Sequence, residues 1–368
     1  MAVKYLAGDR LTGTAAERAA MTATKPYWQL LGREKRESNG ASVEVTGCDK
    51  KEHVMILGSI IPSASTFLTF SAGNGSYPTS GGGYSDRRRE NFGTSYTTGG
   101  RDNNSIITDI SDDTPMFTVG QIANFDGSDK KVIWNTIYGH DDDTYPESSQ
   151  VVSKCDPNSG QLDQFKIDKN GSGTTFNTDT EMIVLGYDAS DTSGDNIWEL
   201  LATETVGGSS VTSVTTDAFT GKKYLWIQIL NTATAAHNDL IQFGNPSIVA
   251  SSRYDGKVQK DYSYDNEGNE DFFIMGNNAW TGESYTEMFV CNILNKTKLA
   301  LGNVVQAGTA GVGNVPHSTE YYGRFQDNVT SPLITTVKLS SRDASGAVNI
   351  GAGSQIRVWG FDLWFGKN

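Results

Sequence analysis

The chain has 368 residues, with 43 acidic and 30 basic side chains and a formal net charge of −13. This acidity excludes a general nucleic-acid binder, which needs a basic stripe to neutralise phosphate groups. No apolar run approaches the roughly 20 residues of a membrane span, so no membrane partner is expected.

The N-terminus and the cysteines predict where the chain is made. The opening residues lack the apolar core of a signal peptide. Cys48, Cys155 and Cys291 are too few and too scattered for a disulfide framework or a zinc site. Both observations predict synthesis in a reducing cytoplasm and buried thiols.

Residues 1–26 are predicted to form an N-terminal arm outside the folded units. Thr14-Ala15-Ala16-Glu17 is a capping-box pattern, which predicts a short helix. A helix this short has little stability alone, because nucleation is costly. The arm must therefore pack on its own domain or be clamped by a neighbouring subunit. We favour the neighbour, and the residues expected to make this assembly contact are Tyr5, Leu6, Arg10 and Leu11.

Residues 27–188 are predicted to form a first β-sandwich unit. Apolar segments of about four to eight residues, bounded by turn residues, are typical of antiparallel sandwiches. The nearly continuous apolar run 53–60 indicates a strand covered on both faces. Residues 71–91 are expected to be a long polar loop, although the basic cluster Arg87–Arg89 is interpreted as a solvated strand face. Strands are expected near 27–31, 42–46, 53–60, 66–71, 92–97, 105–110, 116–124, 131–138, 149–153, 163–168 and 181–187.

A strand that runs into Gly-aromatic-Asp occurs twice, at Gly186-Tyr187-Asp188 and at Gly360-Phe361-Asp362, a shift of 174 (360 − 186). Other segments recur at shifts between 170 (198 − 28) and 172 (288 − 116), which predicts a tandem duplication with a few loop insertions. The glycines are expected to allow a close approach or a bend, and the aromatic residues to plug the end of each sandwich. The recurring segments are Trp28 with Trp198, Val54–Ile60 with Tyr224–Leu230, Gly73 with Gly244, Met116-Phe117 with Met288-Phe289, and Phe165–Ile167 with Val337–Leu339.

The second half repeats the plan of the first. Residues 189–195 are predicted to be a short flexible linker, and residues 196–368 a second sandwich. The predicted fold is all-β, with two tandem jelly-roll-like antiparallel β-sandwich domains behind a short N-terminal arm.

Signals for catalysis are weak, so we expect a protein that is not an enzyme and carries no organic cofactor. The four histidines form no H-E-x-x-H pair, and the sequence has no G-x-S-x-G elbow. His53 is expected at a strand end, and His237 and His317 are expected to be solvated loop residues.

One acidic loop is a candidate site for Ca²⁺. It reads His140-Asp141-Asp142-Asp143, and Asp141 and Asp143 are the candidate ligands because calcium prefers carboxylate oxygens. The loop lacks the spaced ligands and the turn glycine of an EF-hand, so a solvated loop is the competing interpretation.

Aromatic residues gather in predicted loops and at predicted strand ends. Exposed aromatic rings stack on sugars or anchor protein contacts, because they offer a large rigid area. Tyr77, Tyr84 and Trp280 are the candidates for such surface contact, and ordinary core and rim packing is the competing interpretation.

Three segments resemble a known family. Lys4–Arg18 (KYLAGDRLTGTAAER) resembles the N-terminus of virion structural proteins from tailed viruses of aquatic microbes. Ala310–Pro316 (AGVGNVP) and Tyr322–Phe325 (YGRF) resemble the β-rich unit that follows it in those proteins. The resemblance covers the arm and the second unit well and the first unit less well. Its motifs are structural, so it implies a β-rich virion component and transfers no catalytic residue.

Together these features predict a non-enzymatic virion structural protein, either a capsid-associated decoration protein or a tail or fibre component. It is expected to act through subunit interfaces and the tethering arm, as a homo-oligomer and with other virion proteins. One alternative is a pair of carbohydrate-binding modules that attach to a host-surface glycan. Another is a double jelly-roll major capsid protein.

Overall fold

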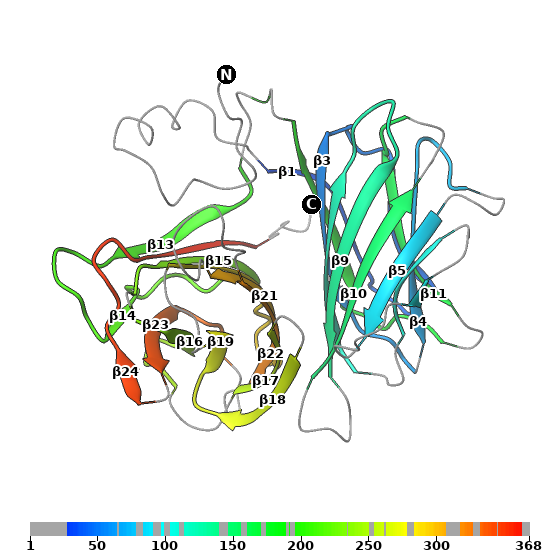
Figure 1. Cartoon of the computed structure of the whole chain (residues 1–368). Coiled ribbons are helices and arrows are strands. Elements are labelled where there is room, and N and C mark those ends of the chain that lie inside the picture. The colour runs from blue at the N-terminus through cyan, green and yellow to red at the C-terminus, as the bar shows by residue number, and fades with distance from the viewer. Residues whose placement is uncertain are drawn as a thin grey trace. The chain divides into compact units, whose positions relative to one another are not determined.

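Every regular element in the described part of the chain is a β-strand (Figure 1). The all-β prediction is therefore confirmed. This part of the chain contains no helix that is long and apolar enough to cross a membrane. This computed structural model describes residues 28–362 apart from residues 65, 79–83, 91–96, 99–103, 110–113, 140–145, 156–159, 171–173, 189–190, 192–195, 234, 250–253, 261–262, 278–282, 307–316, 327–331 and 344.

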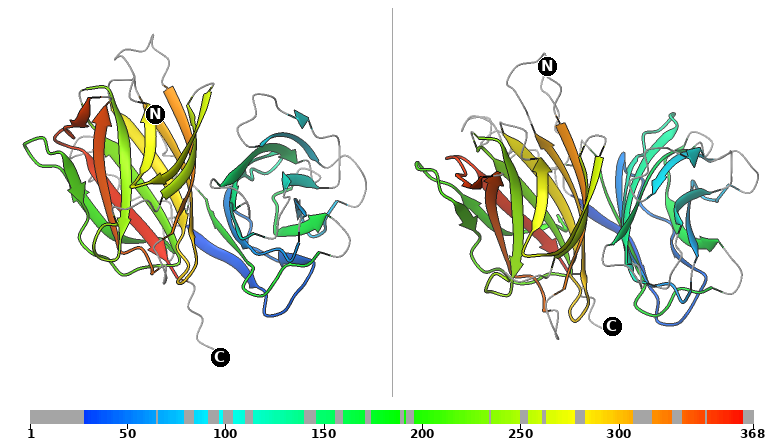
Figure 2. Two further views of the ribbon diagram at one scale, coloured as in Figure 1. Left: turned by 90° about the horizontal axis from the view of Figure 1, so that it is seen from below. Right: turned by 60° about the horizontal axis from the view of Figure 1, so that its bottom comes forward.

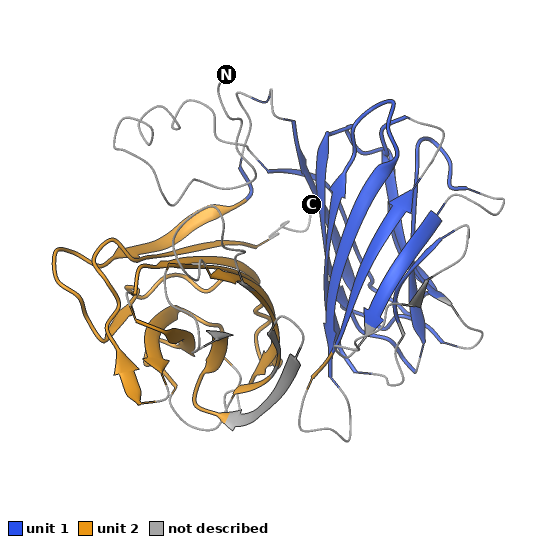
Figure 3. Ribbon diagram, in the orientation of Figure 1, with its two compact units in different colours: residues 1–141, 148–197 blue, residues 142–147, 198–368 orange. Residues whose placement is uncertain are grey.

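The chain divides into two compact units (Figure 3). Unit 1 consists of residues 1–141 and 148–197, and unit 2 of residues 142–147 and 198–368. Each unit contains one large and one small antiparallel sheet, so each is described by itself as a β-sandwich.

In unit 1 the large sheet has eight strands and the small sheet four. The large sheet has the order β1 (Gln29–Lys35), β12 (Glu181–Tyr187), β3 (His53–Ile60), β8 (Met116–Ala123), β9 (Lys130–Tyr138), β10 (Glu147–Cys155), β5 (Tyr84–Glu90) and β6 (Thr97–Thr98). The small sheet has the order β2 (Ser42–Val45), β11 (Gln164–Asn170), β4 (Phe67–Gly73) and β7 (Ser105–Asp109).

Unit 2 repeats this topology and adds one short strand. Its large sheet has the order β13 (Glu199–Thr205), β25 (Gln355–Phe361), β15 (Tyr224–Asn231), β20 (Ser284–Cys291), β21 (Lys298–Gln306), β22 (His317–Phe325), β17 (Tyr254–Lys260) and β18 (Ser263–Glu270). Its small sheet has the order β14 (Ser213–Thr215), β23 (Thr336–Asp343), β16 (His237–Gly244) and β19 (Phe273–Asn277), and β24 (Gly346–Val348) pairs with β23.

The chain passes back and forth between the two layers of each unit (Figure 2). Strands β1 to β5 alternate between the large and the small sheet, and β13 to β17 do the same. This alternation is the feature of a jelly-roll-like sandwich.

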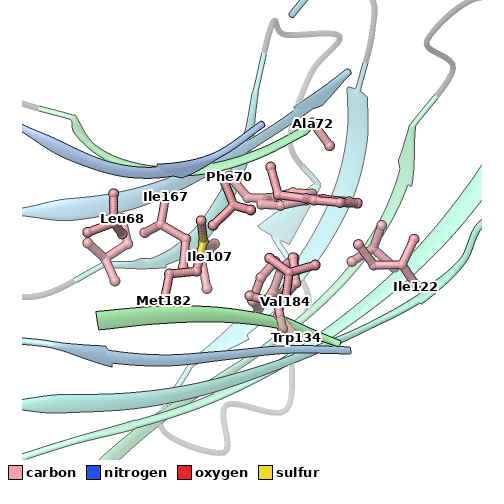
Figure 4. Close-up of a cluster of buried hydrophobic side chains, with 14 of the residues drawn as sticks. Leu68, Phe70, Ala72, Ile107, Ile122, Trp134, Ile167, Met182 and Val184 are labelled. Carbon is pink, nitrogen blue, oxygen red and sulfur yellow. The ribbon is translucent and has the colours of Figure 1, made fainter. Parts of the chain in front are cut away.

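The core of unit 1 lies between its two sheets (Figure 4). Phe70 of β4 packs against Trp134 of β9, with 4.9 Å between the ring centroids, and Leu68 of β4 lies on the side of Met182 of β12. All four side chains are fully buried. Alternation in β9 explains the arrangement, because Val132 and Trp134 point inward while Lys131 and Ile133 are exposed. Each large core side chain stabilises the fold by about 1.5–3 kcal/mol relative to an exposed one.

The strands β3 and β15 are buried on both faces, as the apolar runs predicted. The shift that relates them, however, is 171 (224 − 53) rather than 170. His53 pairs with Tyr187, and Tyr224 pairs with Phe361, so His53 corresponds to Tyr224. The correction matters because a slip of one residue reverses the two faces of a strand.

The predicted match of Met116-Phe117 with Met288-Phe289 is also wrong. Ile122 lies opposite Val54, and Val290 lies opposite Leu225, so the shift here is 168 (290 − 122). The shifts for Gly73 and for Phe165–Ile167 agree with the register of β4, β11, β16 and β23.

Two segments differ from the predicted loops. Residues 84–90 form strand β5 inside the expected loop 71–91, because Tyr84 and Asp86 face the core while Ser85 and Arg87 are exposed. Within the predicted flexible linker, Asp191 is fixed to unit 1 by an ion pair with Lys51 at 2.9 Å. The Asp191 carboxylate also accepts a hydrogen bond from the backbone N–H of Asp188.

Candidate functional site

The predicted plug of the sandwich ends by the Gly-aromatic-Asp strands is wrong. Met182 and Val184 face the core of unit 1, and Ile356 and Val358 face the core of unit 2. Alternation therefore puts Tyr187 and Phe361 on the outer face of each large sheet.

The Tyr187 ring packs edge-on against Trp28 at 4.7 Å between centroids, and Phe361 packs in the same way against Trp198 at 4.6 Å. The following aspartates cap a neighbouring segment: Asp188 accepts the backbone N–H of Glu52. Asp362 similarly accepts the backbone N–H of Lys223. In both units these residues therefore have a structural role.

A buried asparagine joins loops to strands in each unit. The Asn124 amide donates to the carbonyls of Lys51 and Leu162, and its oxygen accepts the N–H of Leu162. Asn292 makes the same three bonds with Lys222 and Ile334.

A buried lysine fixes the neighbouring turn in each unit. The ammonium group of Lys130 donates to the carbonyls of Phe125 and Ser128, at 2.5 and 2.7 Å. Lys298 does the same with the carbonyls of Ile293 and Lys296, at 2.5 and 2.8 Å. Backbone carbonyls thus compensate both buried charges.

Tyr84 is not a surface residue, so its predicted contact role is wrong. The ring is 2% exposed, and its hydroxyl donates to the Ala72 carbonyl at 2.9 Å. Tyr254 bonds to Phe243 in the corresponding place. The polar sequence around Tyr84 gave no sign that its side of β5 faces the core.

Tyr77 is half-buried, between Lys166 and Glu44. The ammonium group of Lys166 lies 5.3 Å from the ring centroid. Burial raises the pKa of the Tyr77 hydroxyl, and the adjacent Glu44 carboxylate raises it further. The third predicted contact residue, Trp280, lies outside the described residues, as do the arm residues Tyr5, Leu6, Arg10 and Leu11.

The predicted calcium ligands Asp141 and Asp143 also lie outside the described residues. Within the described part of the chain, no group of three histidine, cysteine or acidic residues is arranged to hold a metal ion. The Ca²⁺ site therefore stays a prediction.

His237 is a buried strand residue rather than a solvated loop residue. Its Nε2 atom lies 3.5 Å from Oδ1 of Asp239, and the Ser284 hydroxyl donates to Oδ2 of the same carboxylate at 2.5 Å. Asn231 completes the cluster with a bond to Oδ1. The carboxylate therefore lies between the serine and the histidine, whereas a nucleophile–base pair needs a direct serine–histidine bond.

A polar and aromatic network lies on the outer face of the large sheet of unit 2, opposite the core. We call it the outer-face network, and its members come from β15, β20 and β25. The indole N–H of Trp359 donates to Gln228 at 3.1 Å, and the Gln228 amide donates to the Tyr285 hydroxyl at 3.1 Å. The indole N–H of Trp226 donates to Glu287 at 2.8 Å.

The outer-face network combines buried and partly exposed aromatic residues. Trp226 stacks on Phe289 at 5.8 Å and is covered by Trp198 at 5.7 Å, whereas Trp359 and Tyr285 are partly exposed. Burial raises the pKa of the Glu287 carboxyl, and the bond from Trp226 lowers it in part. The network can present a ring face together with hydrogen-bonding groups.

The same positions in unit 1 carry apolar residues without hydrogen-bonding groups, and the counterpart of Tyr285 is Phe117 at the shift of 168. Met55 corresponds to Trp226, Leu57 to Gln228, and Leu185 to Trp359, given the register of the two sheets. Sequence reasoning missed the network because the run 223–230 reads as a nearly continuous apolar strand. Alternation puts Trp226 and Gln228 on one face of β15, but only the strand pairing brings Trp359 of β25 and Glu287 of β20 beside them.

The three cysteines are buried thiols, as the sequence predicted. Burial raises the pKa of the Cys48 thiol to about 11, and Asp163 and Asp49 add to the effect. A thiol with so high a pKa is a poor nucleophile at neutral pH.

Comparisons with known proteins give no family. No family model and no curated protein matches the chain. The chain is similar to domains LG4-5 of the mouse laminin alpha1 chain, with 9% identity and a TM-score of 0.21 over 90% of this chain and 89% of that chain. It is also similar to the LG1-3 region of the laminin alpha2 chain, with 9% identity and a TM-score of 0.21 over 87% of this chain and 68% of that chain. At such TM-scores these similarities support no argument about function.

Proposed function

We propose that the protein is a non-enzymatic structural component of a virus particle, made in the host cytoplasm and assembled into the virion. It acts through contacts with further copies of itself and with other virion proteins. The resemblance of Lys4–Arg18 to virion proteins of tailed viruses supports this assignment.

The observation that carries the proposal is the repetition of structural anchors in both units. Asn124 and Asn292 make the same bonds, as do Lys130 and Lys298. In both units these buried asparagine and lysine side chains hold loops in place. This arrangement favours a rigid protein over one with catalytic turnover. Such a design suits an architectural protein.

The arm is the part of the chain that we propose to tether one subunit to the next. Deletion of residues 1–25 is expected to leave both sandwiches folded, because each unit has its own core. The truncated protein should be monomeric and missing from particles made in a complementation assay. Circular dichroism and thermal melting check the fold, and normal incorporation into particles would contradict the tether.

A second candidate function is attachment to a glycan, and the outer-face network favours it. Trp359 and Tyr285 are partly exposed, and Gln228 holds both in place. An aromatic ring flanked by amide and hydroxyl groups is suited to the apolar face and the hydroxyl groups of a sugar.

A glycan array separates the two functions. If the network binds sugar, the wild type gives specific signals that Trp359→Ala abolishes. Val211→Ala is the control and should leave them unchanged, because this exposed residue pairs with Ile350 and lies outside the strands β15, β20 and β25 that carry the network. Blank arrays with the wild type would exclude this second function and leave the architectural one intact.

A further inference from the structure

The large sheet of unit 1 carries a second exposed feature on its outer face, across β9, β10 and β5. On β10, Val151, Ser153 and Cys155 point into the core, so Val152 and Lys154 point outward. Lys131 and Ile133 do the same on β9, and Arg87 does so on β5. We call this the basic strip, and it consists of Arg87, Arg89, Lys131, Ile133, Val152 and Lys154.

Side-chain contacts between β9 and β10 show how the residues of the basic strip are arranged. Lys154 forms an ion pair with Asp129, just before β9, at 2.6 Å, and Gln150 donates to Asn135 at 3.3 Å. These two contacts show that β9 and β10 are antiparallel, with Val152 opposite Ile133. Val152 also lies opposite Arg87 in the pairing of β10 with β5.

The strip combines positive charge with exposed apolar surface. Ile133 is 44% and Val152 48% exposed, which is unusual for adjacent aliphatic residues at the middle of a sheet. Cations surround them on all three strands, and the Arg89 guanidinium is oriented by Gln150 at 3.2 Å. Among the described residues, Asp129 contacts the strip through Lys154, and this hydrogen bond lowers the pKa of the Asp129 carboxyl.

We infer that the basic strip binds an anionic linear polysaccharide, one that carries sulfate or carboxylate groups. Charge complementarity identifies the ligand class, since four cations gather on one face of a chain whose net charge is −13. Neighbouring strands are about 4.8 Å apart, so the three strands of the strip span about 10 Å, a width that suits an extended polymer. Ile133 and Val152 would contact the C–H faces of the sugar rings.

The side-chain types argue against nucleic acid as the ligand. Proteins that bind single strands stack bases on aromatic rings. Among the described outward-facing residues of β5, β9 and β10 there is no aromatic ring, since Tyr84, Trp134 and Tyr138 are buried on the core side. The inference does not rest on the proposed virion function, because binding is measured on the purified chain.

Titration with fluorescent dextran sulfate, with uncharged dextran as the comparison, tests the inference. The wild type should bind dextran sulfate in a salt-dependent manner and should not bind dextran. The triple variant Arg87→Ser/Lys131→Ser/Lys154→Ser should lose about tenfold or more in affinity and show a shallower salt dependence.

The matched control removes the same charge elsewhere in unit 1, with Lys35→Ser/Lys50→Ser/Lys169→Ser. Its affinity should change less than about threefold, because these lysines lie on β1, before β3 and on β11, outside the strands β5, β9 and β10 that carry the strip. Ile133→Ser/Val152→Ser should weaken binding and leave the salt dependence unchanged, because it removes no charge. Thermal melting confirms that each variant is folded.

Three results would overturn the inference. The first is an equal loss of affinity in both triple variants, which would show that binding depends only on the net charge of the chain. The second is tighter binding of oligo(dT) than of dextran sulfate, which would assign the strip to nucleic acid. The third is self-association of the wild type that the strip variant abolishes, which would make a second copy the occupant.

Discussion

At the scale of single residues, Gly186 and Gly360 show why the repeated motif requires glycine. A Cβ atom on Gly186 would lie 2.6 Å from Leu31 Cδ1 and 2.9 Å from Lys51 Cβ. A Cβ atom on Gly360 would meet Leu201 and Lys222 at 2.6 and 3.0 Å. The expected close approach is therefore confirmed in both units, and the aromatic residue that follows packs against a tryptophan.

Gly186→Ala and Gly360→Ala should each lower the free energy of unfolding by about 1–3 kcal/mol, because the added methyl group overpacks the site. Gly207→Ala is the matched control, since a Cβ atom there meets nothing within 4 Å. It should be neutral or slightly stabilising. Urea unfolding measures all three, and equal stability of the three variants would show that the close approach carries no cost.

Cys48 should react slowly with iodoacetamide in the folded protein. Its pKa is raised from 9.0 to about 11, so at pH 8 its thiolate fraction is about 100-fold below that of the unfolded chain. The raised pKa also contributes stability that is fully present below pH 9 and is lost as the pH rises through 11. Mass spectrometry of Cys48 labelling between pH 8 and pH 11 tests this, and equal rates in folded and urea-unfolded chains would refute it.

At the scale of elements, the repeated anchors hold the sandwich together where strands give way to loops. Asn124 follows β8 and Asn292 follows β20, and each satisfies backbone groups of two other segments. Such groups are costly to leave without a partner once they are buried. Both units therefore use a buried asparagine to satisfy the backbone groups where a strand ends and a loop begins.

Asn124→Ala and Asn292→Ala should each destabilise the unit that contains them by about 2–4 kcal/mol, because each leaves buried backbone groups unsatisfied. Asn303→Ala, at an exposed position of β21, is the control and should change stability by less than about 0.5 kcal/mol. Hydrogen exchange locates the loss of protection. Loss confined to the mutated unit is expected, and no loss in either unit would show that the asparagines are dispensable.

The sequence alone was enough for elements with strong alternation or strong repetition. The strands 53–60 and 181–187 and the all-β class follow from apolar periodicity, and the close approach at the two glycines follows from the Gly-aromatic-Asp repeat. The expected plug did not follow, because Tyr187 and Phe361 lie on the outer face of each large sheet. For β5, only Arg87–Arg89 were interpreted as a strand face, and its start at the buried Tyr84 was missed because the surrounding sequence is polar. The outer-face network and the basic strip were also missed, because each joins residues of three strands and the sequence does not show which strands are neighbours.

At the scale of the whole molecule, two sandwiches with the same strand order each contain their own core. Their outer faces have diverged: at equivalent positions, unit 1 has Met55 and Leu57 where unit 2 has Trp226 and Gln228. A duplicated scaffold with different surfaces is what we expect of a protein that presents distinct contacts to its neighbours. This divergence supports the proposed role in a virus particle, alongside the repeated structural anchors.

Locating the protein in purified particles tests this proposal most directly. Quantitative mass spectrometry of density-banded virions, with immunogold labelling of intact particles, measures its copy number and position. We expect many copies per particle, in a fixed ratio to the major capsid protein and at regular positions on the particle surface. A protein that stays in the host-cell lysate and is missing from banded virions would contradict the account.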